Sequence, residues 1–279
     1  MNRKIFENAQ NYCNKNVFKL GTSKYYSFIT LNQNKKDAIA SIISFYEKIF
    51  DISKHNKNKD ISLVKINWWK KEINNIYEKK PSHPISIALL NIIKKYKIEK
   101  KFFFNIIKGS QLNLNNKQYK SLADLKRLFY YSYISIAFLI LRILECTEKN
   151  YIYFANYISI SIHLIKIIKN LGKDLRLKKL YVPREYIEKI DQNLYKNKNQ
   201  RDLKQLLNVL KLITKYVQKF YKIGINKINT REKKIKSIMI LSSIYMDNLK
   251  QIENENFDIL NQEISITPIK KIFILYKYK

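Results

Sequence analysis

The chain has 279 residues, 46% of them hydrophobic, with only four Gly and four Pro, so it can build a sizeable core but has few turn formers for a many-turned β fold. Its 54 Lys and Arg against 22 Asp and Glu give a formal charge of +32. Because Lys, Asn, Ile and Tyr are all abundant, as an AT-rich genome favours, this charge is only a weak indication of a polyanionic partner.

The N-terminal half is expected to form helices after a ragged start. Within the ragged start, about residues 1–20, Met1 to Asn16 have neither the apolar stretch of a secretory signal nor the Arg-rich pattern of a transit peptide. Isoleucines at three- and four-residue steps predict the first helix, and prolines end the second. The expected helices cover residues 36–50, 64–77, 85–96 and 99–107, with a polar break at 55–59 and a loop at 109–118.

The C-terminal half repeats this pattern with longer helices. Ser121 and Asp124 resemble a capping box that starts a helix running to residue 144. Its most apolar run, 129–141, is too short for a membrane span of ~20 residues and predicts a buried core helix. Further helices are expected at 151–169, 202–221, 231–251 and 268–276. Without an internal repeat or a linker, the sequence predicts an all-α fold in one domain, residues 1–279.

The cysteines and histidines give little support to a metal or redox site. Cys13 and Cys146 are isolated in the sequence, which excludes a disulfide framework and a C-x-x-C motif and fits a reducing compartment. His83 lies between two prolines without a second ligand at suitable spacing, so it is expected to cap a turn or pack at a helix entrance. His55 and His163 lack such partners too, and His163 is expected in the core. No metal site is expected.

Most of the notable aromatic residues are assigned to the core. Trp69 lies on the apolar stripe of its helix, whereas Trp68 lies partly off it and is a candidate for a partner contact. Tyr130, Tyr131 and Tyr133 suit base stacking on a basic surface, but in so apolar a helix they are expected to pack in the core. No nucleic-acid-binding signature is present, and no nucleic-acid partner is expected.

Three segments resemble the squalene/phytoene synthase superfamily. The first is residues 23–28 with the helix that ends near Asp51, and the second is residues 119–144. The third is residues 168–183, which ends in Tyr181-Val182-Pro183. This resemblance extends over most of the chain, and it implies an isoprenoid-synthase-like bundle of helices around a central cavity.

Enzymes of that superfamily hold Mg²⁺, and through it a substrate diphosphate, with two Asp-x-x-x-Asp motifs that face each other across the cavity. At the matching positions this chain has Phe50 and Lys54, with Asp51 nearby, and then Asn170 and Asp174. Three of the four carboxylates are missing, and an ammonium group beside a cation site adds repulsion. The resemblance therefore implies no catalytic residues and no cofactor, with Mg²⁺ needed only if the chain is an enzyme.

The resemblance also implies a remnant of the diphosphate pocket. Lys169 stands where the family usually has Arg, and Lys does not reproduce a bidentate guanidinium contact, so an anion site there would be weakened or reshaped. The expected remnant consists of Asp51, Lys54, Lys169, Asn170, Asp174 and Tyr181.

Within the superfamily, the chain resembles the non-catalytic group of complex I (NADH dehydrogenase) assembly factor 6-like proteins. The shared features are residues 66–71, which include Trp68 and Trp69, the proline-flanked His83 within residues 81–89, and residues 257–260. Trp68, Trp69 and His83 are the candidate partner or pocket contacts.

This second resemblance implies a role in the assembly of respiratory complex I, through a complex I subunit or an assembly intermediate. It implies a place in the bacterial cytoplasm or the mitochondrial matrix, peripheral to the inner membrane, with an anionic membrane surface or a prenyl lipid as further partners. Two alternatives stay open. One is an active head-to-head prenyl diphosphate transferase of isoprenoid biosynthesis, and the other is a basic, helical nucleic-acid-binding protein.

Overall fold

A computed structural model describes residues 2–55, 58–115, 118–177, 180–187 and 200–278 of the chain. In these ranges the regular elements are all helices, with one isolated parallel bridge between Gln118 and Leu180. The expected all-α class is therefore confirmed.

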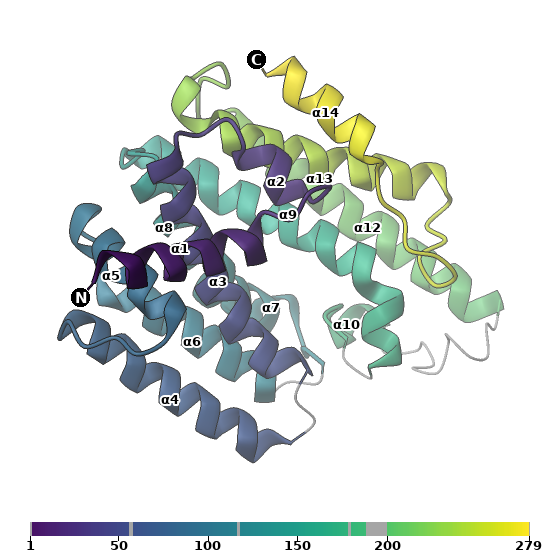
Figure 1. Cartoon of the computed structure of the whole chain (residues 1–279). Helices are drawn as coiled ribbons and strands as arrows, with labels where there is room; N and C mark the ends of the chain where they lie inside the picture. The colour runs from purple at the N-terminus through teal and green to yellow at the C-terminus, as the bar shows by residue number, and fades with distance from the viewer. Residues whose placement is uncertain (1, 56–57, 116–117, 178–179, 188–199, 279) are drawn as a thin grey trace.

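The helices follow one another in the order shown in Figure 1. They are α1 (Arg3–Val17), α2 (Ser23–Phe28), α3 (Gln33–His55), α4 (Lys59–Tyr77), α5 (Pro84–Lys95), α6 (Lys100–Asn115), α7 (Leu122–Leu128), the π-helical η1 (Phe129–Ile134), α8 (Ser135–Ile143), α9 (Lys149–Arg176), α10 (Arg184–Ile187), α12 (Gln200–Ile225), the 3-10 helix η2 (Lys233–Ile235), α13 (Lys236–Asn254) and α14 (Pro268–Lys277). Most extend the predicted ranges by a few residues at one or both ends. The polar break at 55–59 lies between α3 and α4, and the side chain of His55 lies outside the described residues.

The long helix α9 lies at the centre of the bundle (Figure 1). It packs against α8, α12, α13 and η1, and the other central helix, α3, packs against α1, α5, α6 and α8. By length and composition alone, α9 is the one helix of the described residues that qualifies as a membrane span, but 67% of its apolar window is buried inside the protein. It is thus a core helix, as its all-round apolar character predicts.

Two hydrophobic clusters divide the interior along α9. The first joins the N-terminal helices to α8 and the beginning of α9, and the second joins α7 and the remainder of α9 to α12. The ring of Tyr46 on α3 packs against both clusters. The boundary between them is where the cavities described below lie.

Several helix starts are capped by side chains. Ser121 accepts a hydrogen bond from the backbone N–H of Asp124 at 3.3 Å, which confirms it as the capping residue of α7. The Nδ1 atom of His83 accepts from the N–H of Ile85 at 3.1 Å. The expected place of His83 at a helix entrance is therefore confirmed.

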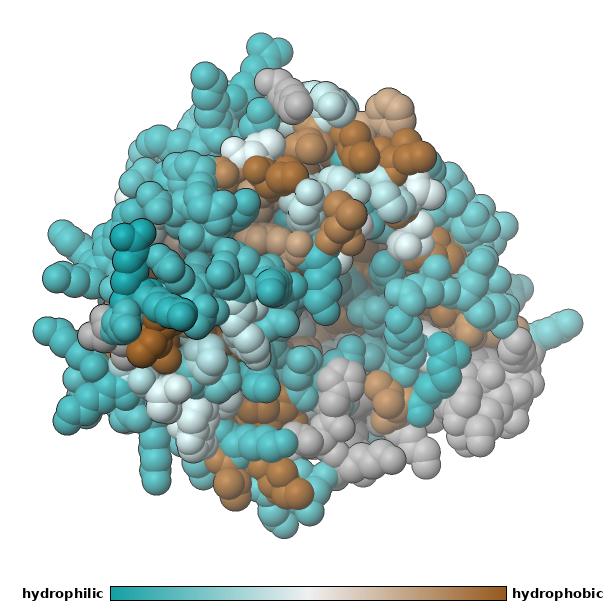
Figure 2. All heavy atoms as spheres, viewed as in Figure 1, coloured by the Kyte–Doolittle hydropathy of each residue, from teal (hydrophilic) through white to brown (hydrophobic). Residues whose placement is uncertain are grey.

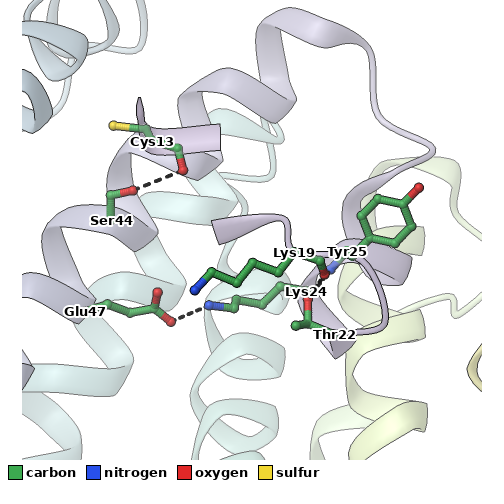
Figure 3. Close-up of polar contacts among 7 residues, drawn as sticks. All are labelled: Cys13, Lys19, Thr22, Lys24, Tyr25, Ser44 and Glu47. Carbon is green, nitrogen blue, oxygen red and sulfur yellow. Dashed lines mark hydrogen bonds and ion pairs between the residues drawn. The ribbon is translucent and has the colours of Figure 1, made fainter. Parts of the chain in front are cut away.

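The expectation of a ragged N-terminus is wrong, because residues 3–17 form the helix α1. Its buried residues Ala9, Cys13 and Val17 recur every four positions and face α3 and α5. Ser44 of α3 donates a hydrogen bond to the backbone carbonyl of Cys13 at 3.4 Å (Figure 3). Three small apolar residues among polar ones are too weak a pattern to recognise in the sequence.

The prediction of a loop at residues 109–118 is also wrong over most of that range, since α6 continues to Asn115. The turn-forming residues of this stretch are held in the helix by contacts with α3. Ser110 donates to the carbonyl of Ile49 at 2.8 Å, and the Asn113 amide donates to the Ser53 hydroxyl at 2.9 Å. These tertiary hydrogen bonds override the local preference for a turn.

The helix expected from 121 to 144 contains a π-helical turn, η1, that the sequence did not indicate. Beside this turn, Gly109 of α6 lies so close to Ser132 that a Cβ atom on the glycine would be 2.0 Å from the serine Oγ. Such turns recur at functional sites. Here the turn bears Tyr133, a residue of the cavity wall.

Candidate functional site

A cavity of about 290 Å³ lies between α3, η1 and α9. Its lining has three carboxylates and two lysines, so the opposite charges nearly cancel. Carboxylates and lysines face one another because α3 and α9 each turn one polar stripe toward the cavity. The lining residues are Tyr46, Glu47, Phe50, Asp51, Lys54, Tyr133, His163, Lys166, Ile167, Asn170, Asp174 and Tyr181.

An ion pair between Lys54 and Asp174 joins the two helices across this cavity. The Lys54 Nζ atom lies 3.7 Å from Oδ1 of Asp174, and the two side chains are 24% and 5% exposed. A carboxylate this well buried requires a compensating charge or hydrogen bonds. The lysine ammonium supplies this positive charge, at the position that matches a carboxylate of the Asp-x-x-x-Asp motif in the superfamily's enzymes.

The donor set does not fit Mg²⁺. This ion takes six oxygen ligands in near-octahedral geometry, and its sites use carboxylates without a competing cation. The side chain of Phe50 offers no oxygen ligand. Lys54 places a positive charge next to Asp174, and this charge would repel Mg²⁺. Among the described residues, moreover, no group of three or more His, Cys, Asp or Glu side chains could hold a metal ion.

A second ion pair occupies Glu47, another carboxylate of the lining. Lys24 of α2 reaches across to Glu47 of α3, with 2.5 Å between Nζ and Oε1 (Figure 3). Thr22 fixes the beginning of α2 by accepting from the N–H of Tyr25 at 3.2 Å. Two of the three carboxylates of the lining therefore already have a lysine partner.

Tyr133 and His163 form a stacked pair in the cavity wall, with ring centroids 3.4 Å apart and planes inclined by 13°. The Nδ1 atom of His163 lies 2.7 Å from the carbonyl of Ser159. Burial, and then the nearby charge of Lys166, hold the pKa of the His163 imidazole well below its ordinary value. The ring is therefore neutral, and with Nδ1 as donor it satisfies that carbonyl, as a core histidine does.

A second, apolar cavity of about 340 Å³ adjoins the first. The two share Tyr46, Glu47, Tyr133, His163 and Lys166 as lining residues. Beyond them, the second cavity is lined mainly by aliphatic side chains of α3, α8, α9 and α13. Burial raises the pKa of the Tyr46 and Tyr133 hydroxyls, so both stay protonated at the boundary between the cavities.

Most of the residues predicted for the pocket remnant lie together. Lys169 is the exception, because it does not line the cavity. Burial lowers the pKa of its ammonium group and outweighs the opposing charge of Glu263. The predicted residues that do line the cavity are Asp51, Lys54, Asn170, Asp174 and Tyr181.

Other lining residues were not predicted as a group. On α3, Glu47 precedes Phe50 by three positions and Lys54 by seven, and on α9, Lys166 precedes Asn170 by four. Steps of three, four and seven place residues on one helix face. This periodicity was the available signal for Glu47 and Lys166, whereas Tyr133 depends on the π turn and had none.

The other predicted contacts line a groove of about 570 Å³ beside α4, which shares Asp51 with the charged cavity. Trp69 is buried against Phe45 and confirms the core prediction, while Trp68 is 42% exposed. The ring of His83 lies 4.9 Å from that of Trp69, between centroids. Thus Trp68, Trp69 and His83 are gathered in one groove, and none of them lines the charged cavity.

The buried Glu72 anchors the loop before α5. Its carboxylate accepts hydrogen bonds from the N–H groups of Ser82 and His83 at 2.7 and 2.9 Å, and from the Ser82 hydroxyl at 2.9 Å. Burial alone would raise the pKa of Glu72, but these hydrogen bonds outweigh it and leave the pKa below its ordinary value. Glu72 thereby fixes His83 against the tryptophans.

The fold and its adjoining polar and apolar cavities define a helical bundle of the isoprenoid-synthase type. A dehydrosqualene synthase structure superposes with a TM-score of 0.80 at 17% identity, covering 99% of this chain and 96% of that one. A squalene synthase from Alicyclobacillus acidocaldarius gives a TM-score of 0.75 at 13% identity, over 90% of this chain and 95% of that one. At such identities the likeness establishes the fold.

The chain belongs to the squalene/phytoene synthase family, whose model matches residues 19–270. It is 21% identical to the human protein named NADH dehydrogenase (ubiquinone) complex I, assembly factor 6, over 94% of this chain and 80% of that protein. It is 18% identical to the phytoene synthase of Arthrospira platensis, over 86% of this chain and 82% of that enzyme. The predicted family is therefore confirmed, and its relatives include both an assembly factor and enzymes.

Proposed function

We propose that the protein is a non-catalytic member of the family that acts in the assembly of respiratory complex I. The non-catalytic part of this proposal is supported most directly by the Lys54–Asp174 ion pair, in which an ammonium group stands where the Asp-x-x-x-Asp motif of the family's enzymes has a carboxylate. The similarity to complex I assembly factor 6 over 94% of the chain points to the same role.

The charges of the cavity favour neither component of a metal diphosphate. Lys54 opposes a metal ion, while Glu47, Asp51 and Asp174 oppose a diphosphate. Ionisation of a prenyl diphosphate needs an electrophile that neutralises the leaving group. The described lining offers two lysines for that task, and one of them is already paired with Asp174.

We further assign the contact with a complex I subunit or assembly intermediate to the exposed face of α4. Ile61, Val64 and Trp68 are exposed and follow one another at steps of three and four residues, so they form one stripe on the helix. An exposed tryptophan within an apolar stripe is typical of the centre of a protein interface. The location that fits such a partner is the matrix or cytoplasmic side of the inner membrane.

The decisive test is a gene-deletion strain assayed for complex I assembly and activity, with the chain returned on a plasmid. The unmodified chain should restore assembly, whereas Trp68→Ala should restore at least tenfold less. Leu177→Ala, a change at another exposed apolar position, is the matched control and should complement normally. Normal assembly in the deletion strain would refute the proposal.

A second test addresses the absence of catalysis. Purified protein with Mg²⁺ and farnesyl or geranylgeranyl diphosphate should release no more diphosphate than its Asp174→Asn variant does. The triple variant Phe50→Asp, Lys54→Asp, Asn170→Asp should gain Mn²⁺ binding, observed by electron paramagnetic resonance, because it restores the oxygen ligands. Diphosphate release that depends on Asp174 would show that the chain is an enzyme.

A further inference from the structure

The C-terminal helix α14 has two apolar faces, one packed against the bundle and one exposed. Ile274 is buried, and Leu275 and Tyr278 pack beside it against a small cluster with α2 and α13. The opposite face consists of Ile269, Ile272, Phe273 and Tyr276, at steps of three, four and seven residues. Ile269 and Phe273 are 65% and 69% exposed.

Positive charge borders this outer face. Lys270 and Lys277 lie along one edge of it in the helical projection, and α14 contains no Asp or Glu. Lys271 is turned toward the protein, where its Nζ donates to the carbonyl of Gly21 at 2.7 Å. That contact holds the loop before α2 beside α14, and residues 18–22 of this loop include no Asp or Glu.

In Figure 1, α14 lies on the outside of the bundle next to α13, with the C-terminus at its end. Figure 2 shows brown, apolar side chains gathered on the same side of the molecule. Monomeric proteins scatter exposed apolar residues singly, so a contiguous group of this kind marks a binding surface.

We propose that the outer face of α14 docks on an anionic lipid bilayer. A short helix with an aromatic and aliphatic face bordered by lysines matches a helix that lies in the plane of a membrane interface. The lysines complement lipid phosphates, and the net charge of +32 favours approach to an anionic surface. Phe273 would enter the acyl region, and Tyr276 would lie at the headgroup level.

This inference deepens the proposed location at the inner membrane and rests on it for the choice of a lipid partner. It does not depend on a role in complex I assembly. Vesicle binding can fail while the deletion strain still loses complex I, and the reverse can also occur. The two proposals are therefore refuted by different results.

The test is co-sedimentation of the full chain with vesicles of phosphatidylcholine, alone or mixed with phosphatidylglycerol. The unmodified chain should bind the mixed vesicles at least tenfold more tightly than the neutral ones. The variant Ile269→Ser, Phe273→Ser should lose at least tenfold in affinity for the mixed vesicles. Lys270→Gln, Lys277→Gln should lose less and should show a weaker dependence on salt.

The matched control is Ile61→Ser, Val64→Ser, which removes two exposed apolar residues from α4 instead. It should bind vesicles like the unmodified chain. Circular dichroism should show the same helix content and thermal midpoint for both pairs of serine variants, since all four positions are exposed. The proposal would be overturned if the α14 variant bound mixed vesicles as tightly as the unmodified chain, or if the α4 variant lost as much affinity as the α14 variant. Failure of the unmodified chain to bind anionic vesicles would overturn it as well.

Discussion

At the scale of single residues, the chemistry of the cavity depends on the residues at positions 50 and 54. A lysine at position 54 forms its ion pair with Asp174 from the neighbouring helix, and Phe50 removes a further oxygen ligand. The pair places an ammonium group beside a nearly buried carboxylate. A bound metal ion and an internal ion pair can both compensate the charge of a buried carboxylate.

Lys54→Met should lower the free energy of unfolding by about 1–3 kcal/mol, because a nearly buried carboxylate loses its ammonium partner. Adding Asp174→Asn should restore part of this loss, because it removes the charge that Lys54→Met leaves unpaired. The double variant should therefore be more stable than the sum of the two single changes predicts. Urea denaturation of all four proteins measures this coupling.

Lys173→Met serves as the control, because Lys173 and Glu263 form an exposed pair. Its effect should stay below about 1 kcal/mol. Equal effects at positions 54 and 173 would contradict the role given to the buried pair.

His163 should make stability depend on pH. Burial keeps the pKa of its imidazole well below the ordinary value in the folded state, whereas the unfolded chain titrates near ~6.5. Below that pH the unfolded state binds a proton that the folded state does not bind. The free energy of unfolding should therefore decrease as the pH falls from about 7 to about 5, by at most ~1.4 kcal/mol per pH unit from this group.

His163→Gln should remove this part of the pH dependence, as followed by urea denaturation at several pH values. His83→Gln is the comparison, because burial lowers the pKa of the half-buried His83 as well but by less. The change at position 83 should have the smaller effect. Parallel pH profiles for the unmodified chain and His163→Gln would rule out His163 as the cause.

At the scale of elements, close packing of α6 on the π turn brings Tyr133 into the cavity wall. Gly109 permits this approach because it has no side chain, and Ser132 lies directly opposite. Helix propensity alone would favour alanine over glycine by ~1 kcal/mol. The tertiary contact reverses that preference.

Gly109→Ala should destabilise the protein by about 1–3 kcal/mol, since the new Cβ would collide with Ser132, including its backbone N at 3.0 Å. Gly224→Ala, where the nearest atoms are side-chain atoms at 3.2 Å, should cost less. Thermal unfolding of the two variants gives the comparison. If Gly109→Ala were more stable than the unmodified chain, α6 and η1 would not be in close contact at this position.

At the scale of the whole molecule, the net charge of +32 works against compactness. Like charges repel more in the folded state than in the expanded one, and salt screens this repulsion. The free energy of unfolding in urea should therefore increase between about 10 and about 300 mM NaCl, where the screening length shortens severalfold. KCl should act alike, and a decrease with either salt would contradict this prediction.

The sequence by itself determined the helical class, because hydrophobic steps of three and four residues are local. It also determined most helix positions and the cap at Ser121. The family resemblance could be recognised from the sequence because its motifs are short, local stretches of residues. The match of the family model over residues 19–270 confirms it.

Only the tertiary structure decided how the polar residues are paired. Lys54 and Asp174 are 120 positions apart, and Lys24 meets Glu47 from another helix, so no local pattern contains either ion pair. The continuation of α6 to Asn115 and the exposed outer face of α14 likewise depend on what packs against each helix. Periodicity specifies which residues share a face, but burial of that face depends on distant segments of the chain.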